Sequence, residues 1–200
     1  MKTVFLHGLG QTAHEWDAVL SRVSLPDADC LELSALPEGE LSYTGLRTGL
    51  EKRYADVKEA FRICGLSLGA VLALDYVIHY KEKVDSLILI GAQYKTPSLL
   101  IDFQNLIFRC MPEKAFSDMG LSKQDMIRLC RSMRSLDFTS GLREVNCPVK
   151  ILCGEKDRAN LKASKQLCKL LPQAELHIVP GAGHEINKCA PEAIAAILNC

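Results

Sequence analysis

The sequence predicts an α/β protein: a three-layer α/β/α sandwich with a mostly parallel six-stranded sheet and a helical cap insertion. Three observations support this fold class. Six strand-like runs alternate with helical patterns, which is typical of a parallel sheet covered on both faces. Two of these runs, residues 87–90 and 149–153, are almost continuously apolar, as strands buried on both faces are. One connection, residues 94–146, is far longer than the usual link of about 2–6 residues.

Length and charge limit the possible classes of protein. The chain has 200 residues, 48% of them hydrophobic, which suits one domain with a sizeable core. We therefore expect a single domain over residues 1–200, with residues 94–146 as an inserted helical cap. The 24 Lys and Arg residues balance 24 Asp and Glu residues, so no basic excess supports binding to nucleic acid or to an anionic membrane. No apolar stretch approaches the roughly 18–20 residues of a membrane span.

The number of cysteines and the sequence of the N-terminus indicate the cellular compartment in which the protein is expected. The nine cysteines are odd in number and form no C-x-x-C pair, which favours free thiols in a reducing compartment over a disulfide framework or a zinc site. The apolar run at the N-terminus is too short for a signal peptide. We therefore expect a cytoplasmic protein. The oligomeric state has no signal in the sequence.

The first half of the chain contains four of the six expected strands. In chain order, all six are expected at residues 3–6, 29–33, 61–64, 86–90, 149–153 and 175–179. Between the first two, Thr12 and Glu15 have the spacing of a capping box, which would open a helix that runs to about Val23. In the second half, Asn160 is placed to cap a helix over residues 161–171, and Pro191 to begin the last helix.

The cap segment, residues 94–146, is unusually rich in large flexible side chains. It holds four of the five methionines and four of the six phenylalanines, and its pattern predicts two or three helices over one end of the sheet. Met119, Met126 and Met133 recur every seven residues and so share a helix face. That face either packs within the helical layer or forms an adaptable apolar wall for a ligand, and both can hold. Met111 and Met119 are our candidate substrate contacts here.

The third expected strand leads into Gly65-Leu66-Ser67-Leu68-Gly69 and then into an apolar helical run. A serine between two glycines at this spacing fits a sharp strand-to-helix turn, in which a side chain at either glycine would collide with its neighbours. The serine hydroxyl is then exposed near the positive end of a helix, which is a nucleophile's position. Alone the motif is weak, because a Gly-rich turn without chemistry has the same pattern.

Polar residues after two later strands strengthen the prediction. Gly154-Glu155-Lys156-Asp157 follows the fifth strand, and Gly183-His184 follows the sixth. Because the carboxyl ends of parallel strands meet at one edge of the sheet, Ser67, Asp157 and His184 are expected to converge there. Glu155 is the nearest rival to Asp157 as the acid. The remaining histidines suit structural or solvated positions better than catalysis; His7 in particular is expected to brace its loop by hydrogen bonds.

With these motifs the chain resembles proteins of the α/β-hydrolase fold over nearly its whole length, from His7-Gly8 to Gly183-His184. The resemblance implies that Ser67 is the nucleophile, His184 the general base and acid, and Asp157 the residue that orients the histidine. It also implies a minimal version of the fold, which begins at the family's third strand. The cap is the least constrained part.

The oxyanion hole is expected from two backbone N–H groups, those of Leu68 and Leu9. Gly8 and Gly10 would let the first loop approach the substrate closely, and Gln11 is a further candidate at the border of the pocket. Three arginines of the cap (Arg128, Arg131 and Arg134) recur every three residues. They form either a solvated helix face or an anion site for a phosphate, coenzyme A or carboxylate group.

The expected activity is a carboxylesterase-like serine hydrolase that cleaves a small carboxylic ester or thioester through an acyl-enzyme. The expected partner is a small acyl ester, without metal or cofactor, since no metal-ligand set and no complete dinucleotide loop occur. Two alternatives remain open. The same triad could cleave carbon–carbon bonds or transfer acyl groups, or the fold could serve a ligand-binding or signalling protein with little or no turnover.

Overall fold

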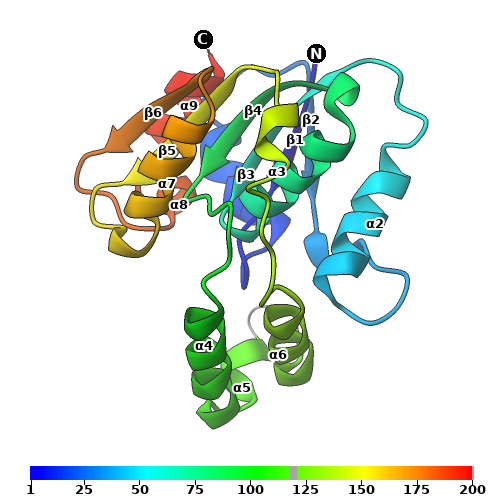
Figure 1. Cartoon of the computed structure of the whole chain (residues 1–200), viewed down its shortest axis with the longest axis vertical. Coiled ribbons are helices and arrows are strands. Elements are labelled where there is room, and N and C mark those ends of the chain that lie inside the picture. Colours follow the sequence, from blue (N-terminus) through cyan, green and yellow to red (C-terminus); the bar gives the residue numbers. More distant parts are fainter. Residues whose placement is uncertain (118–120, 200) are drawn as a thin grey trace.

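The structure, a computed structural model, describes residues 1–117 and 121–199. It has three layers, with a six-stranded sheet between two layers of helices (Figure 1). The strands are β1 (Lys2–Leu6), β2 (Asp27–Leu31), β3 (Phe61–Leu66), β4 (Val84–Ile90), β5 (Val149–Gly154) and β6 (Ala174–Val179). Their order is β2-β1-β3-β4-β5-β6, and every neighbouring pair is parallel. The expected α/β sandwich is therefore confirmed, with a sheet that is parallel throughout.

Alternating side chains on the strands fill two separate cores. On β1, Val4 belongs to one apolar cluster and Phe5 to the other. On β4, Leu87 and Leu89 point into the first cluster and Ile88 into the second. Because successive strand residues face opposite sides, an apolar run can stay buried only if both faces of the sheet are covered.

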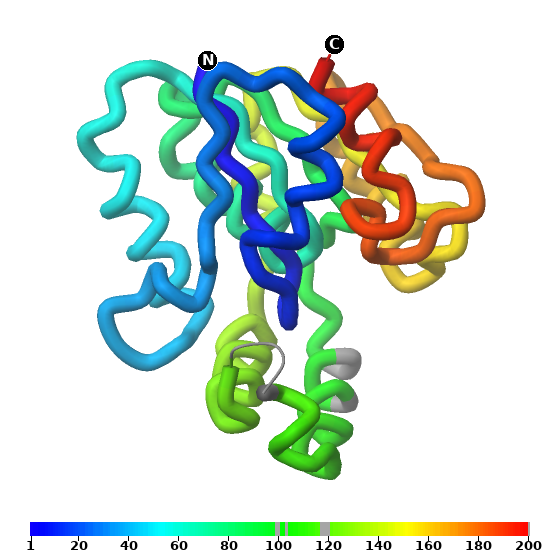
Figure 2. The backbone as a smooth tube through the Cα atoms, turned by 180° about the vertical axis from the view of Figure 1, so that it is seen from behind, coloured from blue at the N-terminus to red at the C-terminus, as the bar shows by residue number. Residues whose placement is uncertain are grey.

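The helices divide between these two faces. One face is covered by α2 (Tyr43–Arg53), α3 (Leu68–His79) and α7 (Arg158–Leu170). The other is covered by the 3-10 helix η1 (Ala13–Trp16) with α1 (Asp17–Leu20), α8 (Ile186–Cys189) and α9 (Pro191–Leu198), which begins at the expected proline (Figure 2). Three short 3-10 helices are η2 (Leu33–Ala35), η3 (Lys81–Lys83) and η4 (Leu142–Glu144). Within the described residues, no helix combines the length and apolarity needed to cross a bilayer.

The cap segment lies beyond the carboxyl ends of the strands (Figure 1). It contains α4 (Ser98–Cys110), α5 (Lys114–Ser117) and α6 (Lys123–Ser132). Its two connections to the sheet are joined by an antiparallel bridge between Lys95 and Asp137, whose side chains form an ion pair of 2.7 Å. The cap therefore leaves and returns at adjacent points above the sheet.

The predicted second strand, 29–33, was placed two residues too late. β2 pairs with β1 from Lys2 opposite Asp27 to Leu6 opposite Leu31, so β2 ends where its neighbour ends. After that point the backbone N–H of Leu33 donates to Nε2 of His7 instead of to a strand. The apolar pattern continued past the strand because Leu33 is buried in η2.

The predicted capping box is also wrong. The side chain of Thr12 makes no capping hydrogen bond, and the segment forms η1 and then one turn of α1 in place of a helix to Val23. The backbone N–H of Ala13 donates to Glu32 of another segment at 3.2 Å. Glu15 forms an ion pair with Lys188. Ala13 and Glu15 thus interact with residues distant in sequence, and no capping box forms between Thr12 and Glu15.

The helix after β5 begins earlier than expected. α7 starts at Arg158, and its N-cap is Asp157, whose carboxylate accepts from the backbone N–H of Asn160 at 3.3 Å. Asn160 therefore lies inside the first turn and is not the cap. The carboxylate at the strand end reaches the free N–H groups of that turn, which carry partial positive charge.

Candidate active site

Ser67 lies at the turn between β3 and α3. Its φ is 53° and its ψ is −111°, and it is the one non-glycine residue with a positive φ in the described part of the chain. Its backbone N–H donates to the carbonyl oxygen of Ile90 at 2.8 Å, which holds the turn against β4. A Cβ at Gly65 would collide with the backbone of Gly69, and one at Gly69 with Leu6 of β1. Such local strain persists only where the surrounding packing enforces it.

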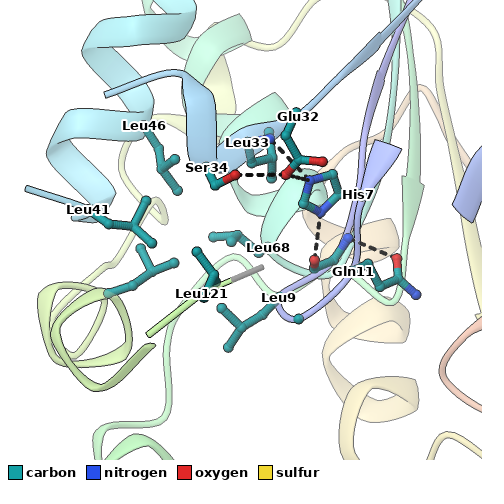
Figure 3. Close-up of a pocket in the computed structure, with 13 residues that line it drawn as sticks. His7, Leu9, Gln11, Glu32, Leu33, Ser34, Leu41, Leu46, Leu68 and Leu121 are labelled. Atoms are coloured by element: carbon teal, nitrogen blue, oxygen red, sulfur yellow. Dashed lines mark hydrogen bonds and ion pairs between the residues drawn. The ribbon is translucent and has the colours of Figure 1, made fainter. Parts of the chain in front are cut away.

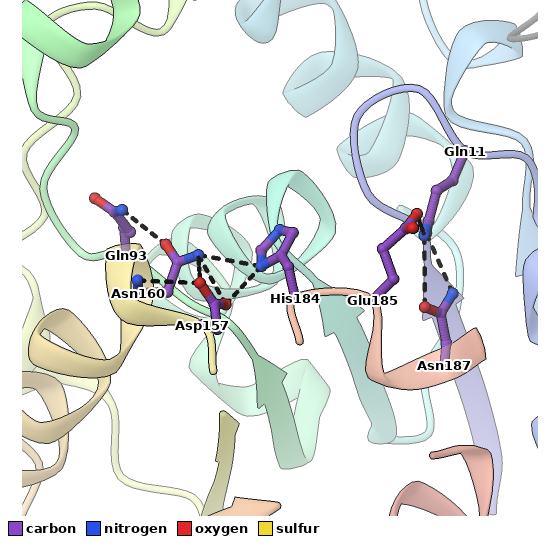
Figure 4. A network of polar contacts seen from close by, with 7 residues as sticks. All are labelled: Gln11, Gln93, Asp157, Asn160, His184, Glu185 and Asn187. Carbon is purple, nitrogen blue, oxygen red and sulfur yellow. Dashed lines mark hydrogen bonds and ion pairs between the residues drawn. The ribbon is translucent and has the colours of Figure 1, made fainter. Parts of the chain in front are cut away.

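Asp157 and His184 meet at the carboxyl ends of β5 and β6. Oδ2 of Asp157 is 2.7 Å from Nδ1 of His184, with the carboxylate buried and the imidazole 37% exposed (Figure 4). Burial opposes ionisation of Asp157, but hydrogen bonds from His184 and Asn160 outweigh it and hold the pKa of the carboxyl below its ordinary value. Asp157 is thus suited to remain an anion beside the imidazole.

Asn160 is a third member of this group that the sequence analysis assigned only to a helix cap. Its Nδ2 lies 2.9 Å from both carboxylate oxygens of Asp157 and 3.1 Å from Nδ1 of His184. Its own Oδ1 accepts from Nε2 of Gln93 at 2.8 Å, which orients the amide (Figure 4). Gln93 follows β4, so residues after three neighbouring strands are joined here.

The loop after β1 is braced from within the fold, as expected for His7. Nε2 of His7 accepts from the backbone N–H of Leu33 at 3.1 Å, so Nδ1 carries the proton and donates to the carbonyl oxygen of Gly8 at 2.8 Å. A water-sized pocket of about 20 Å³ lies beside this loop, lined by His7, Leu9 and leucines of several elements (Figure 3). The backbone N–H of Leu9 makes no hydrogen bond within the described residues.

Gln11 ties this loop to the loop that carries His184. Its Oε1 accepts from the backbone N–H of Gly8 at 3.1 Å and from Nδ2 of Asn187 at 3.2 Å. Its Nε2 donates to Glu185 at 2.8 Å (Figure 4). Gln11 and Asn187 are buried whereas Glu185 is exposed, so the network runs from the interior to the surface. Two loops 174 residues apart in sequence are therefore held as one unit.

A cavity of about 420 Å³ opens between this edge of the sheet and the cap. Ser67 and His184 both line it, and so do Leu9 and Leu68, the expected oxyanion residues. Within the described residues no hydrogen bond joins the side chains of Ser67 and His184, and Nε2 of His184 has no partner. Leu68 is the first residue of α3, where a helical N–H lacks an intrahelical partner.

The cap supplies the apolar side of this cavity. From α4, α6 and the residue that follows α6, the lining side chains are Ile101, Gln104, Phe108, Met126, Cys130 and Met133. Burial raises the pKa of the Cys130 thiol to about 12, so this sulfur is uncharged at neutral pH. Met126 and Met133 belong to the methionine face that was expected to pack within the helical layer or to contact a ligand. Both of them line the cavity.

The other predicted substrate contacts lie elsewhere. Gly8 and Gln11 line the small pocket beside the first loop and not the cavity of Ser67. Met111 follows α4 and is not part of the cavity lining; its carbonyl oxygen accepts from Nζ of Lys123. Met119 lies outside the described residues. Gln93 and Asn160 line the cavity instead. The signal in the sequence that could have indicated them is their position shortly after the ends of two strands.

Glu155, the rival acid, lies away from the cavity of Ser67, and so do Trp16 and His14 near the first loop. Glu155 is exposed, and its carboxylate accepts from the backbone N–H of Gly181 at 2.8 Å, away from His184. The indole of Trp16 is fully buried against Phe5. The side chain of His14 is largely exposed. Among the described residues, no group of three or more His, Cys, Asp and Glu side chains has the arrangement of a metal site.

Known proteins share this sequence pattern and this architecture. A family model described as "Alpha/beta hydrolase family" matches residues 3–197. The chain is 24% identical to the "Putative 2-succinyl-6-hydroxy-2,4-cyclohexadiene-1-carboxylate synthase" of Bacillus subtilis (strain 168), over 98% of this chain and 88% of that protein. A stretch of 77 residues is 30% identical to the "Putative carbamate hydrolase RutD" of Escherichia coli (strain K12 / DH10B), which covers 38% of this chain and 29% of that protein.

Solved structures agree in fold at low sequence identity. A hydrolase from Pseudomonas aeruginosa PA01 has a TM-score of 0.84 at 16% identity, over 98% of this chain and 87% of that one. MenH from S. aureus has a TM-score of 0.76 at 16% identity, over 99% of this chain and 91% of that one. At these identities the likeness establishes the fold alone.

Proposed function

The chain belongs to the α/β-hydrolase family, and from that premise we propose that it is a serine hydrolase that cleaves a small carboxylic ester or thioester through an acyl-enzyme. The observation that supports this most directly is the 2.7 Å contact between Asp157 and His184, on the wall of the cavity that Ser67 also lines. A buried, ionised carboxylate beside an accessible imidazole is the arrangement that a serine nucleophile needs.

In this mechanism the three side chains move one proton. Asp157 accepts the hydrogen bond from Nδ1–H of His184, which leaves Nε2 as the base. Nε2 takes the proton of the Ser67 hydroxyl as Oγ attacks the substrate carbonyl, and returns it to the leaving group. Because Ser67 and His184 are not hydrogen-bonded before substrate enters, a conformational adjustment must bring them together. Apo geometry of this kind is common, and the contact tightens in the complex.

The oxyanion is assigned to the backbone N–H groups of Leu68 and Leu9. Both residues line the cavity, and the N–H of Leu9 is free of other hydrogen bonds within the described residues. The loop of Leu9 is held by His7 and Gln11, so the donor is fixed before substrate arrives. Preorganised donors of this kind typically contribute about 2.7–4 kcal/mol each to lowering the barrier.

The lining of the cavity favours an uncharged, apolar acyl group. Ile101, Phe108 and Met133 supply apolar surface, and no Lys or Arg side chain lines the cavity among the described residues. The product named for the Bacillus subtilis relative carries a succinyl and a carboxylate group. This cavity offers such acid groups no cation, and Glu185 at its edge would repel them. We therefore favour ester or thioester cleavage over that reaction.

Replacement of the nucleophile tests the proposal. We expect burst release of the chromophore from a short activated ester by the wild type, and a loss of roughly 10⁴-fold or more in kcat/KM in Ser67→Ala. A fluorophosphonate probe should label the peptide that contains Ser67 in the folded wild type. Ser21→Ala, which removes an exposed hydroxyl in another loop, should keep both activity and labelling. Equal turnover by Ser67→Ala would reject the assignment.

A further inference from the structure

A surface groove of about 700 Å³ opens directly from the catalytic cavity. The two share four lining residues: Gln93, Thr96, Pro97 and Ala159. On its far side the groove is bordered by α7, through Lys162 and Gln166. These two residues also line a shallow depression along the outside of the same helix. A molecule with its reacting end at Ser67 can therefore extend along the groove onto the exposed face of α7.

That exposed face is strongly cationic. Arg158, Lys162, Lys165 and Lys169 are spaced by four, three and four residues, which places them along one side of the helix. We call these four residues the α7 cationic face. All four are exposed, and α7 contains no acidic residue. Within the described residues, none of their side chains forms an ion pair or a hydrogen bond.

Most of these cations destabilise the helix, although Lys169 in the last turn lies at the favourable negative end of the helix dipole. Like charges at these spacings repel each other along a helix, and Arg158 in the first turn faces the positive end of the helix dipole. The chain as a whole has no net charge, so the concentration of cations is local to this helix. A polyanion that binds here would relieve the repulsion.

The cap arginines, in contrast, are largely occupied. Arg128 pairs with Asp125 at 3.2 Å and with Glu40 at 3.5 Å. Arg134 makes a two-armed contact with Asp102 at 2.8 and 2.9 Å. These arginines were expected to form either a solvated helix face or an anion site. An anion bound by Arg128 or Arg134 would first have to break these ion pairs. Arg131 forms no ion pair within the described residues, but it lines neither the cavity nor the groove that opens from it, whereas Lys162 of α7 lines that groove.

We propose that the α7 cationic face binds the phosphate groups of a thioester substrate of the coenzyme A class. The proposal rests on the function proposed above and adds the identity of the leaving group. In such a thioester the phosphates are separated from the reacting sulfur by a long neutral arm. That arm would lie in the groove, where Lys95 is paired with Asp137 and Lys162 belongs to the α7 cationic face, and the other lining residues are uncharged. The acyl group would occupy the apolar cavity under the cap.

The reaction balances with water as the second substrate. Oγ of Ser67 bonds to the thioester carbonyl carbon, the C–S bond breaks, and the sulfur leaves with the proton that His184 took from the serine. Water then attacks the acyl-serine with His184 as base. The products are a carboxylic acid and the free thiol, and Ser67 regains its proton. No oxidant or reductant is required.

A matched pair of substrates tests the phosphate site. The wild type is assayed with one acyl group carried either on coenzyme A or on pantetheine, which has the same thiol arm without phosphates. We expect the KM for the coenzyme A ester to be about tenfold lower, which corresponds to about 1.4 kcal/mol. Added salt should remove this advantage, because exposed charges are screened. Equal KM values for the two esters at low salt would overturn the proposal.

Charge reversal locates the site on α7. Lys165→Glu/Lys169→Glu changes two residues that line neither the cavity nor the groove opening from it. The double variant should lose the tenfold preference, measured as the ratio of the two KM values. Lys58→Glu/Lys114→Glu makes the same change in net charge at exposed positions outside α7 and should retain it. If both double variants lose the preference, the preference depends on the overall charge of the protein, and the assignment of the phosphate site to α7 is wrong.

Binding without turnover separates this proposal from the proposed function. Free coenzyme A is titrated into Ser67→Ala protein in a calorimeter at low salt. Binding that Lys165→Glu/Lys169→Glu weakens about tenfold supports the site even if no ester is hydrolysed. Absence of binding overturns the site, even if chromogenic esters are cleaved normally.

Discussion

At the scale of single residues, Asn160 stands out because it serves two structures at once. Its backbone N–H is capped by Asp157, and its side-chain amide donates to the same carboxylate. Gln93 holds the amide in the donating orientation. The carboxylate of Asp157 is therefore held by helix α7 as well as by His184. This makes Asn160 a positioning residue for the Asp157–His184 pair.

Asn160→Ala should remove the amide donor while Asp157 still caps the helix through the backbone. A hydrogen bond to a charged group contributes about 1.5–3 kcal/mol, so we expect kcat to fall roughly 10–100-fold with a smaller change in KM. The pKa of Asp157 should rise, so the variant should begin to lose unfolding free energy on acidification at a higher pH than the wild type. The measurements are steady-state kinetics for both proteins and the pH profile of their unfolding in urea.

Asn160→Ser restores a short side-chain donor at this position and should recover part of the activity and of the original pH profile. If the alanine variant keeps the wild-type kcat and loses only thermal stability, Asn160 is structural and the positioning role is wrong.

At the scale of elements, hydrogen bonds between the loops after β1 and β6 position the residues of the candidate site. Gln11 connects the loop after β1 with the loop after β6 through Glu185 and Asn187. The first loop presents the expected oxyanion donor at Leu9, and the second presents His184. The network thus fixes the position of Leu9 relative to His184.

Gln11→Leu should disrupt both stability and catalysis. It leaves the buried amide of Asn187 with a lost partner, which typically costs about 1–3 kcal/mol of unfolding free energy. Because the loop of Leu9 is released, kcat should fall about tenfold or more while KM changes less. Thermal unfolding and steady-state kinetics measure the two effects. His14→Ala, at an exposed position of the same segment, should stay within about 0.5 kcal/mol of the wild type.

The helix α6 offers an independent test of the cavity. Met126 is buried on this helix and lines the cavity of Ser67. Met126→Ala should lengthen the preferred acyl chain in a series of chromogenic esters, because truncation enlarges the apolar end of the site. Removal of a buried methionine typically costs about 2–5 kcal/mol of stability, so the comparison is made well below the melting temperature. An unchanged optimum in a folded variant would place the acyl group elsewhere.

At the scale of the whole molecule, carboxylates tie distant segments together in their ionised form. Burial of Glu32 favours the acid form, but hydrogen bonds from the backbone N–H of Ala13 and the hydroxyl of Ser34 lower its pKa. The hydrogen bond from Gln11 is the main cause of the lowered pKa of Glu185. Asp157 behaves in the same way. Because these groups hold their protons less tightly when folded, the unfolded chain binds more protons in acid.

The free energy of unfolding should therefore be constant near neutral pH and fall as the pH drops below about 5. The loss begins near the ordinary glutamate pKa and continues through the lower folded values. Urea titrations at several pH values between about 3 and 7 measure it. Glu185→Gln, which cannot titrate, should show a shallower fall, whereas Glu59→Gln at an exposed position should follow the wild type. Parallel curves for all three proteins would contradict the assignment to Glu185.

Some features were predictable because their signals are local. The six strands, the parallel sheet and the glycines around Ser67 follow from apolar patterns and from the steric demands of a tight turn. Their order along the chain also predicted that Asp157 and His184 would lie together, since parallel strands end at one edge. Predictions were wrong where a hydrogen-bond partner distant in sequence replaced a local one. At the start of η1, for example, Glu32 accepts a hydrogen bond from the backbone N–H of Ala13, and the side chain of Thr12 makes no capping hydrogen bond.

The sequence by itself determined the fold class and the identity of the candidate nucleophile, acid and base. Only the tertiary structure decided that Asn160 and Gln93 support the acid, that Gln11 joins two loops, and that unpaired cations of α7 border the groove from the cavity. The physical reason is that periodicity records which face of an element is buried. Contacts between side chains far apart in sequence depend on how the elements pack, and they leave no periodic signal in the chain.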